Sequence, residues 1–156
     1  MENTVLNSHL QLSYPEGFRV MDPQELKQYA YGSLPASALK DPDRHMILTF
    51  GYKTVGALAA FLLGAKDMAR SIEAQLRRPM RAFGYRPRGS VSRNVGGKKA
   101  DGYTYTYTAQ GIGMAGETLV VKDGRTFYYL YCYMREAQLE ESTAVWKEII
   151  ASARWI

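Results

Sequence analysis

The chain of 156 residues carries 20 Lys and Arg against 15 Asp and Glu, giving a formal net charge of +5. Its hydrophobic content of 46% and charged content of 22% are near the averages of globular proteins, which excludes a largely disordered chain. The length suits one domain, expected over residues 1–156, which can bury roughly two-thirds of its unfolded surface and needs no disulfide or metal to fold.

Two short strands joined by a turn are the first predicted elements. His9–Tyr14 alternates apolar and polar residues, which is typical of a half-buried strand. Pro15-Glu16-Gly17 has the residue types of a turn, and Phe18–Met21 is expected to form the second strand.

The sequence marks the start of a first helix clearly. Asp22 can cap the helix, and Pro23 takes the first helical position, where its missing N–H has no cost. Glu25 completes the spacing of a capping box. Gly32 is expected to end this helix.

The middle of the chain predicts a loop and a strand. Lys40–Arg44 contains two carboxylates, which fit turn chemistry better than a metal site because no further ligands cluster nearby. His45–Lys53 is predicted to be a strand. One of its faces is apolar: Met46, Leu48, Phe50 and Tyr52. Residues 55–64 fit either a short buried helix or the approach to the next helix.

An amphipathic helix is predicted from Ala65 onward. Its apolar residues follow the i, i+3, i+4, i+7, i+11 spacing of one helix face: Ala65, Met68, Ala69, Ile72 and Leu76. Pro79 should end the helix, because a proline in a helix interior costs about 3 kcal/mol or more. Residues 81–100, rich in arginine and glycine, are expected to form irregular strands.

The C-terminal third predicts three strands with tyrosines at alternate positions. Two faces are marked in this way: Tyr103, Tyr105 and Tyr107 on the first strand, and Tyr129, Tyr131 and Tyr133 on the last. Alternating threonines give the first of these strands a polar second face, which suggests a peripheral position in the sheet.

The last two strands are predicted to form a hairpin. Asp123-Gly124 tolerates the positive φ angles of a type I′ turn, which would place Val120 opposite Phe127 and Leu119 opposite Tyr128. Both faces of the final strand are apolar, so this strand should lie centrally with a layer on each side. A closing helix, about Leu139–Ser152, offers an apolar face to one layer: Trp146, Ile149, Ile150 and Ala153.

The predicted fold class is α+β, an α/β/α sandwich, with a largely antiparallel sheet of about six or seven strands and three main helices covering both faces. The order of elements, the turn Tyr14–Phe18 (YPEGF) and the closing segment Val145–Trp155 (VWKEIIASARW) resemble the bacterial branch of the PsbP-like fold superfamily. That superfamily includes the extrinsic P protein of photosystem II and a Ran-binding nucleotide-release factor. The resemblance implies a binding or accessory role without catalysis. It maps no functional residue of those proteins onto this sequence, so their partners are not carried over.

Two glycine-rich segments resemble nucleotide-binding motifs without their structural context. Gly111–Gly116 has the G-x-G-x-x-G spacing, but a strand (Glu117–Val121) follows instead of the helix that would meet a pyrophosphate. These glycines are expected to form a flexible or bulged connection between strands. Gly96–Lys99 lacks both the upstream glycine and the Ser or Thr of a phosphate loop. We therefore expect no cofactor.

No motif indicates a catalytic or metal site. Cys132 lies between two tyrosines on a predicted strand, and the only histidines are His9 and His45, so the thiol is expected to be a small buried core residue. Asp43, Arg44 and His45 form the polar cluster from which an enzyme hypothesis would start. We expect no catalytic residues, no metal, and a protein that is not an enzyme.

The strongest functional signal is a basic segment. Between Glu73 and Asp101 the sequence has no acid and eight basic residues: Arg77, Arg78, Arg81, Arg86, Arg88, Arg93, Lys98 and Lys99. One interpretation is a solvated pair of loops that keeps the protein soluble and protects a sheet edge. A second is a contact surface for an acidic protein partner. A third is binding of nucleic acid, helped by stacking on Phe83 and Tyr85, or of anionic lipid headgroups.

The preferred hypothesis is a non-enzymatic binding or accessory protein that acts through a protein–protein contact. The alternative is a nucleic-acid or anionic-surface binder that uses residues 77–99. The N-terminus lacks the features of a secretory signal, and the longest apolar run, Ala57–Leu63, is too short to span a membrane. We therefore expect a soluble cytoplasmic protein without a membrane span, either a monomer or a homodimer.

Overall fold

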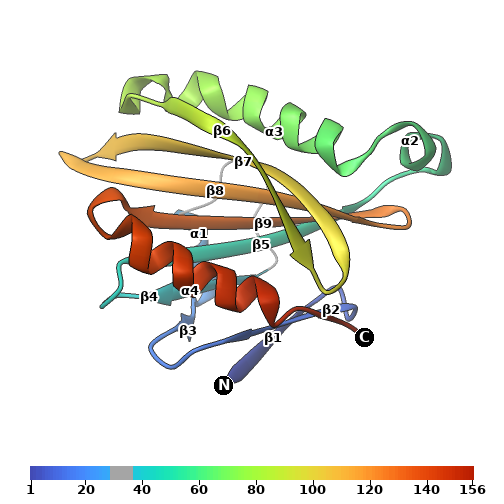
Figure 1. Cartoon of the computed structure of the whole chain (residues 1–156), viewed down its shortest axis with the longest axis horizontal. Helices are drawn as coiled ribbons and strands as arrows, with labels where there is room; N and C mark the ends of the chain where they lie inside the picture. Colours follow the sequence, from blue (N-terminus) through green and yellow to red (C-terminus); the bar gives the residue numbers. More distant parts are fainter. Residues whose placement is uncertain (29–36) are drawn as a thin grey trace.

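The structure is a computed structural model that describes residues 1–28 and 37–156. Its strands form two antiparallel sheets, one in the order β3-β4-β5-β9-β8-β7-β6 and one in the order β1-β2-β10 (Figure 1). The strands are β1 Glu2–Leu6, β2 Leu10–Tyr14, β3 Arg19–Val20, β4 Ser37–Asp41, β5 Met46–Thr54, β6 Arg86–Val95, β7 Lys98–Ala109, β8 Ile112–Asp123, β9 Thr126–Arg135 and β10 Arg154–Trp155. The helices are α1 Pro23–Gln28, α2 Ala57–Leu62, α3 Ala65–Met80 and α4 Leu139–Ala151, with two 3-10 turns, η1 Arg81–Phe83 and η2 Glu136–Gln138.

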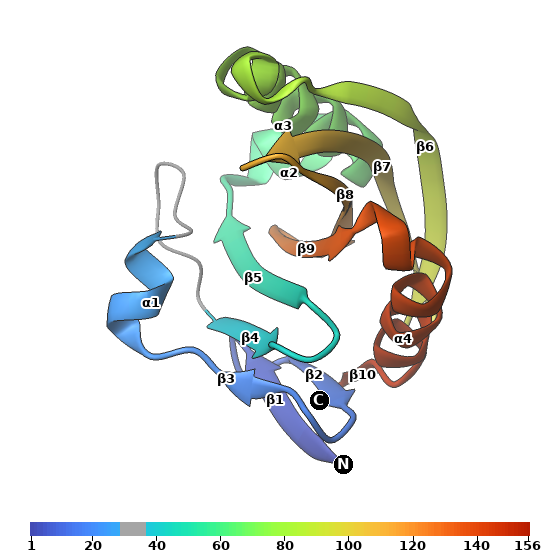
Figure 2. The same ribbon diagram turned by 90° about the vertical axis from the view of Figure 1, so that its left-hand side faces the viewer.

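Helices α3 and α4 lie on opposite faces of the large sheet (Figure 2). Under α3, Ala69 packs in a buried cluster with side chains of β7, β8 and β9, among them Tyr105, Val120 and Phe127. The predicted stripe from Ala65 to Leu76 faces this cluster, which confirms the helical period read from the sequence. The predicted fold class, an α/β/α sandwich around a largely antiparallel sheet, is confirmed.

A larger core lies on the other face, between the large sheet, α4 and the three-stranded sheet. Trp146 and Ile149 of α4 are fully buried there with Leu12 of β2 and with Leu130 and Cys132 of β9. The prediction that Cys132 is a core residue is confirmed, and burial raises the pKa of its thiol well above the ordinary value.

Strand β9 is the middle strand of the seven, as predicted from its two apolar faces. Phe127 and Tyr128 point to opposite faces, and each is at most 1% exposed. Strand β7 lies next to the edge strand β6, which agrees with the peripheral position predicted from its polar threonines.

The three-stranded sheet was only partly predicted. β2 matches the expected strand of residues 9–14, but β1 and β10 carried no clear sequence signal. β10 pairs with β2 through Trp155 opposite Leu10, and the N–H of Ile156 donates to the carbonyl of His9 at 2.7 Å. Two-residue strands are set by the partner that they meet and not by a local pattern.

The register predicted for the β8–β9 hairpin is wrong by two positions. Phe127 lies opposite Lys122 and Tyr128 opposite Val121, because the two turn residues are Gly124 and Arg125 and not Asp123 and Gly124. Gly124 has φ +60° and is the only turn residue with positive φ, as at the first central position of a type II′ turn. A shift of two preserves the alternation, so the predicted faces of both strands are correct.

The expected flexible or bulged connection at Gly111–Gly116 is also wrong. Gln110 and Gly111, with φ of 52° and 78°, form a two-residue turn, and Gly113 and Gly116 lie within β8 in unbroken register with β7. Gly116 is required by packing, because a Cβ there would come within 2.3 Å of the Tyr105 ring. The motif therefore reflects a hairpin turn and one close contact between strands.

Residues 81–100 are more regular than predicted. After η1, strands β6 and β7 form a continuous antiparallel hairpin with one register shift between Pro87 and Gly89.

Residues 55–64 contain the short helix α2, but its side chains are mostly exposed and only Ala60 is buried. Helix α3 ends at Met80, one residue after the predicted stop at Pro79.

Candidate functional site

The eight basic residues predicted as a binding segment do not form one surface. Arg77 and Arg78 lie in the last turn of α3, and Arg81 follows in η1. Arg86, Arg88 and Arg93 lie along β6, while Lys98 and Lys99 begin β7. The ten residues of β6 separate Arg86 from these lysines by about 30 Å of extended chain. The structure therefore divides the set into groups with different roles.

Arg93 is half-buried and belongs to a hydrogen-bonded network with the buried Glu117. Its Nε and Nη2 donate to Glu117 Oε2 and Oε1 at 2.7 and 2.6 Å, and Trp146 Nε1 donates to the same carboxylate at 2.6 Å. The Glu117 side chain is 4% exposed and that of Arg93 18% exposed. The hydrogen bond with Glu117 raises the pKa of Arg93 further. This network joins the edge strand β6 to β8 and to α4.

The two lysines of the segment are held by local contacts. Lys98 Nζ lies 3.3 Å from Asp123 Oδ1 and 5.4 Å from the centre of the Trp155 ring. Lys99 Nζ lies 3.7 Å from Asp101 Oδ1, with its side chain 72% exposed. Both lysines complement the two carboxylates and the aromatic ring beside them, and neither lies near the arginines of α3 and η1.

Four arginines remain exposed and make no ion pair within residues 1–28 and 37–156: Arg78, Arg81, Arg86 and Arg88. We call these four residues the arginine surface. Arg88 is the unpaired residue at the register shift of β6, where a bulge redirects a side chain out of the ladder. Arg77, which pairs with Glu73 at 2.8 Å, borders this surface.

A shallow hollow of ≈ 170 Å³ adjoins the arginine surface. It is lined by Arg81 of that surface and by Arg77, Tyr85 and Pro87. The Tyr85 hydroxyl donates to Glu73 at 3.1 Å, and its ring packs 5.3 Å from the ring of Tyr105. Burial, and then the neighbouring Glu73 carboxylate, raise the pKa of Tyr85, so the phenol stays neutral. Tyr85 and Pro87 thus give the hollow a fixed and partly apolar floor.

The polar cluster proposed for an enzyme hypothesis is a turn. Arg44 forms an ion pair with the buried Asp41, and its Nη1 donates to the carbonyl of Glu16 at 3.0 Å. The N–H groups of Asp43 and Arg44 donate to Asp41 Oδ1 at 3.0 and 3.2 Å. His45 follows with φ 56° and is exposed. These contacts agree with the turn chemistry predicted for Lys40–Arg44.

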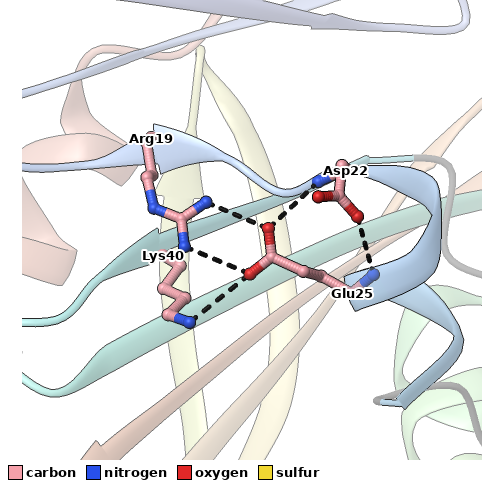
Figure 3. Close-up of polar contacts among 4 residues, drawn as sticks. All are labelled: Arg19, Asp22, Glu25 and Lys40. Carbon is pink, nitrogen blue, oxygen red and sulfur yellow. Dashed lines mark hydrogen bonds and ion pairs between the residues drawn. The ribbon is translucent and has the colours of Figure 1, made fainter.

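A second polar cluster surrounds Glu25 at the start of α1 (Figure 3). The N–H of Glu25 donates to Asp22 Oδ1 at 2.9 Å and that of Asp22 to Glu25 Oε1 at 3.4 Å, which confirms the predicted capping box. Arg19 donates two hydrogen bonds to the Glu25 carboxylate, and Lys40 a third. The pKa of Glu25 is lowered to about 2, and the hydrogen bonds from Arg19 contribute most to this lowering. Gly32, predicted to end this helix, lies outside the described residues.

The cluster around Glu25 fixes a short helix to the strands β3 and β4, so its role is structural. Across the described ranges, no group of three or more His, Cys, Asp or Glu side chains could hold a metal ion. Among the helices that the structure describes, none is both long and apolar enough to cross a bilayer.

The sequence did not reveal two features of the site. Glu117 is a single acid in an otherwise apolar stretch of β8. Such an acid is expected to be buried and paired with a basic residue, and this could have indicated its contact with Arg93. The second feature is the hollow: Tyr85 was predicted only as a stacking residue, and its position beside Pro87 follows from the meeting of the end of α3 with the start of β6.

No known family model and no curated protein matches this sequence. Solved structures do match it. The solution structure of cyanobacterial PsbP (CyanoP) from Synechocystis sp. PCC 6803 is similar with a TM-score of 0.69 and 10% identity, over 99% of this chain and 92% of that chain. The crystal structure of LpqN, involved in cell envelope biogenesis of Mycobacterium tuberculosis, is similar with a TM-score of 0.61 and 13% identity. The match covers 94% of this chain and 82% of that chain.

A crystal structure from Bacteroides thetaiotaomicron VPI-5482 gives a TM-score of 0.56 and 11% identity, over 94% of this chain and 45% of that longer chain. Identities this low bear on the arrangement of helices and strands and not on the side chains of any site. For CyanoP and LpqN the likeness extends over nearly the whole of this chain. This chain therefore has the PsbP-like fold.

Proposed function

We infer that this chain is a non-enzymatic binding protein that contacts an acidic protein through its arginine surface. One observation carries the proposal: Arg78, Arg81, Arg86 and Arg88 are exposed and unpaired in the described ranges, while the other basic residues of the segment have acidic neighbours. A guanidinium group presents donors in a planar fork that matches a carboxylate. Four such unpaired groups, of which Arg81 lines the hollow, suit a partner segment with several Asp or Glu side chains.

The surroundings of the hollow support a protein partner. Arginine and tyrosine are the residue types that dominate binding energy at protein–protein interfaces. Tyr85 is held by Glu73 and Tyr105, so a partner would meet a pre-organised surface and lose little affinity to ordering. The surface is less suited to nucleic acid, because one face of the Tyr85 ring packs against Tyr105 and cannot stack on a base.

The test is a reversal of charge on this surface. The variant Arg81→Glu/Arg86→Glu/Arg88→Glu leaves the half-buried Arg93 intact. The control Lys27→Glu/Lys147→Glu/Arg154→Glu makes the same change in net charge at exposed positions elsewhere. Affinity capture from the native lysate, followed by quantitative mass spectrometry, should give the same acidic proteins with the wild type and the control. The arginine variant should bind them about 100-fold more weakly, since each lost charge-assisted contact costs on the order of 1–3 kcal/mol.

Equal capture by all three proteins would place the contact elsewhere and refute the proposal. An oligonucleotide titration distinguishes an acidic protein partner from the alternative, a nucleic acid. If the arginine surface bound duplex DNA through all four side chains, log affinity should fall against log salt with a slope of about −3.6. Such a slope, abolished by the arginine variant, would replace the acidic protein with nucleic acid as the partner.

A further inference from the structure

The segment Gly56–Gly64, with the sequence GALAAFLLG, presents an apolar surface to solvent. Leu58 is 72% exposed, Phe61 85%, Leu62 64% and Leu63 36%. We call these four residues the α2 patch. Large apolar side chains are normally exposed singly, and a contiguous group of them marks a contact site. Figure 1 places α2 at one end of the long axis of the molecule, at the right of the view.

The backbone beneath the α2 patch is fixed by two basic side chains from the β8–β9 hairpin. Lys122 Nζ donates to the carbonyl of Leu63 at 2.8 Å and also to that of Ala60, which satisfies two carbonyls at the C-terminal end of α2. Arg125 Nε donates to the carbonyl of Val55 at 2.9 Å, and the N–H of Val55 donates back to Arg125 at 2.8 Å. These carbonyls and the Val55 N–H therefore do not depend on water, as an apolar environment requires.

Basic side chains border the α2 patch. Lys53 precedes it, and Lys66 and Arg70 follow in the first turns of α3; all three are exposed and have no ion pair with any described residue. Residues 53–72 contain a single acid, Asp67, whose Oδ2 accepts a hydrogen bond from the N–H of Gly64 at 2.9 Å. The environment is thus an apolar tip with a positive border.

We propose that the α2 patch docks onto the surface of an anionic lipid bilayer. Phe61, Leu58 and Leu62 enter the boundary between headgroups and acyl chains, and Lys53 and Lys66 contact the acidic headgroups. An apolar helix face and a basic border are the two signals that together give interfacial binding. The chain then lies on one leaflet, held by a single short helix, and its attachment is reversible.

The size of the α2 patch favours lipid over another protein. Three side chains on a helix of six residues and that of Leu63 after it cannot supply the roughly 800 Å² per partner that a stable protein–protein interface buries. A second copy would also bring the same unpaired cations, Lys53, Lys66 and Arg70, against one another. A lipid surface needs no such area, because each apolar side chain that enters the bilayer contributes independently.

This surface is separate from the arginine surface. Helix α3 has 16 residues, so its two ends lie about 24 Å apart, with the α2 patch near the first end and Arg78 and Arg81 at the other. Loss of one contact should leave the other intact, and the two proposals can fail independently.

The experiment measures partition of the full chain onto vesicles by flotation. Phosphatidylcholine vesicles with a minority of phosphatidylglycerol are compared with pure phosphatidylcholine. The wild type should float with the anionic vesicles, and Leu58→Ser/Phe61→Ser should reduce the partition coefficient about tenfold or more, because full burial of one large apolar side chain is worth that factor. Phe83→Ser/Ile112→Ser removes one aromatic and one aliphatic side chain that are 43% and 40% exposed elsewhere, and should float as the wild type does.

Two further variants test the mechanism without removing apolar contacts. Lys53→Glu/Lys66→Glu should reduce flotation with anionic vesicles and leave the weak binding to neutral vesicles unchanged. Phe61→Trp should show a blue shift of its fluorescence on addition of anionic vesicles, against a constant background from the native tryptophans, Trp146 and Trp155.

Three results would overturn the proposal. One is absence of wild-type flotation with anionic vesicles at low salt. Another is equal loss of flotation in Phe83→Ser/Ile112→Ser or in the arginine variant, which would place lipid contact elsewhere. The third is a lipid-free dimer in sedimentation velocity that becomes monomeric in Leu58→Ser/Phe61→Ser, which would make a second copy the occupant of the α2 patch.

Discussion

At the scale of single residues, Glu117 shows how a basic segment can mix structural and binding roles. Its carboxylate accepts two hydrogen bonds from Arg93 and one from Trp146, all of 2.7 Å or less. Because this site is shielded from water, a charged group that lost its partner here would be neither paired nor solvated. Each member of the network therefore depends on the others. The exposed arginines of α3, η1 and β6 have no such dependence and can serve a partner.

We therefore expect Glu117→Gln to reduce the free energy of unfolding by about 3 kcal/mol, because it leaves the half-buried Arg93 guanidinium without its counter-charge. Urea denaturation measures the change. Lys99→Gln is the matched control: it breaks a pair at 3.7 Å whose lysine is 72% exposed, and should cost less than about 1 kcal/mol. Equal losses in the two variants would contradict a structural role for the Arg93–Glu117–Trp146 network.

At the scale of elements, strand β8 shows how a motif can arise from packing alone. Gly116 lies opposite Tyr105 on β7, and the tyrosine ring fills the space above the glycine. Tyr103, Tyr105 and Tyr107 then stack along β7 at 5.8 Å between ring centres. The third glycine of the G-x-G-x-x-G spacing thus leaves room for the row of tyrosine rings on β7. Its presence is explained without a bound phosphate.

Two alanine substitutions in the same strand test this explanation. Gly116→Ala should destabilise the fold by about 1–3 kcal/mol, because its Cβ cannot be placed 2.3 Å from the Tyr105 ring without shifting it. Gly113→Ala meets no atom nearer than 3.6 Å and should be neutral or slightly stabilising. Thermal unfolding of the two variants gives the comparison, and an unchanged melting temperature for Gly116→Ala would refute the packing role.

At the scale of the whole molecule, the sequence predicted the features that depend on local periodicity. The apolar stripe from Ala65 to Leu76 and the two apolar faces of β9 follow from periods of 3.6 and 2, so they could be read without a partner. The hairpin register could not, because Gly124 supports either of two turns and only the strand pairing chooses between them. Features fixed by a distant contact were missed for the same reason.

The candidate site illustrates this limit. Arg93 and Arg88 look equivalent in the sequence, and only the fold separates them, by setting Arg93 against an acid 24 residues away. The α2 segment was predicted to be helical or a connection, and if helical then buried, because it is apolar. In the structure the helix forms at one end of the molecule, where Ala60 is buried but Leu58, Phe61 and Leu62 remain exposed.

The tyrosine-rich core also sets how the whole molecule responds to alkali. Burial raises the pKa values of Tyr103, Tyr105 and Tyr131 above the ordinary value of about 10. The folded state therefore holds these phenol protons more tightly than the unfolded state does. The resulting stability is fully present below about pH 10 and is lost as the pH rises above it, at about 1.4 kcal/mol per pH unit for each such tyrosine.

We expect a cooperative alkaline unfolding in which phenol ionisation, measured by ultraviolet absorbance, coincides with loss of the circular dichroism signal. Tyr103→Phe should make the decline in stability above about pH 10 less steep by the contribution of one proton. Its hydroxyl makes no hydrogen bond of ordinary length within the described residues, so this variant should be no less stable than the wild type near neutral pH. Tyr52→Phe, at a ring 42% exposed, is the control and should leave the alkaline transition in place. Phenol ionisation that runs to completion while the circular dichroism signal persists would show that the tyrosine face is open to solvent, contrary to the packing of α3 on β7 and β8.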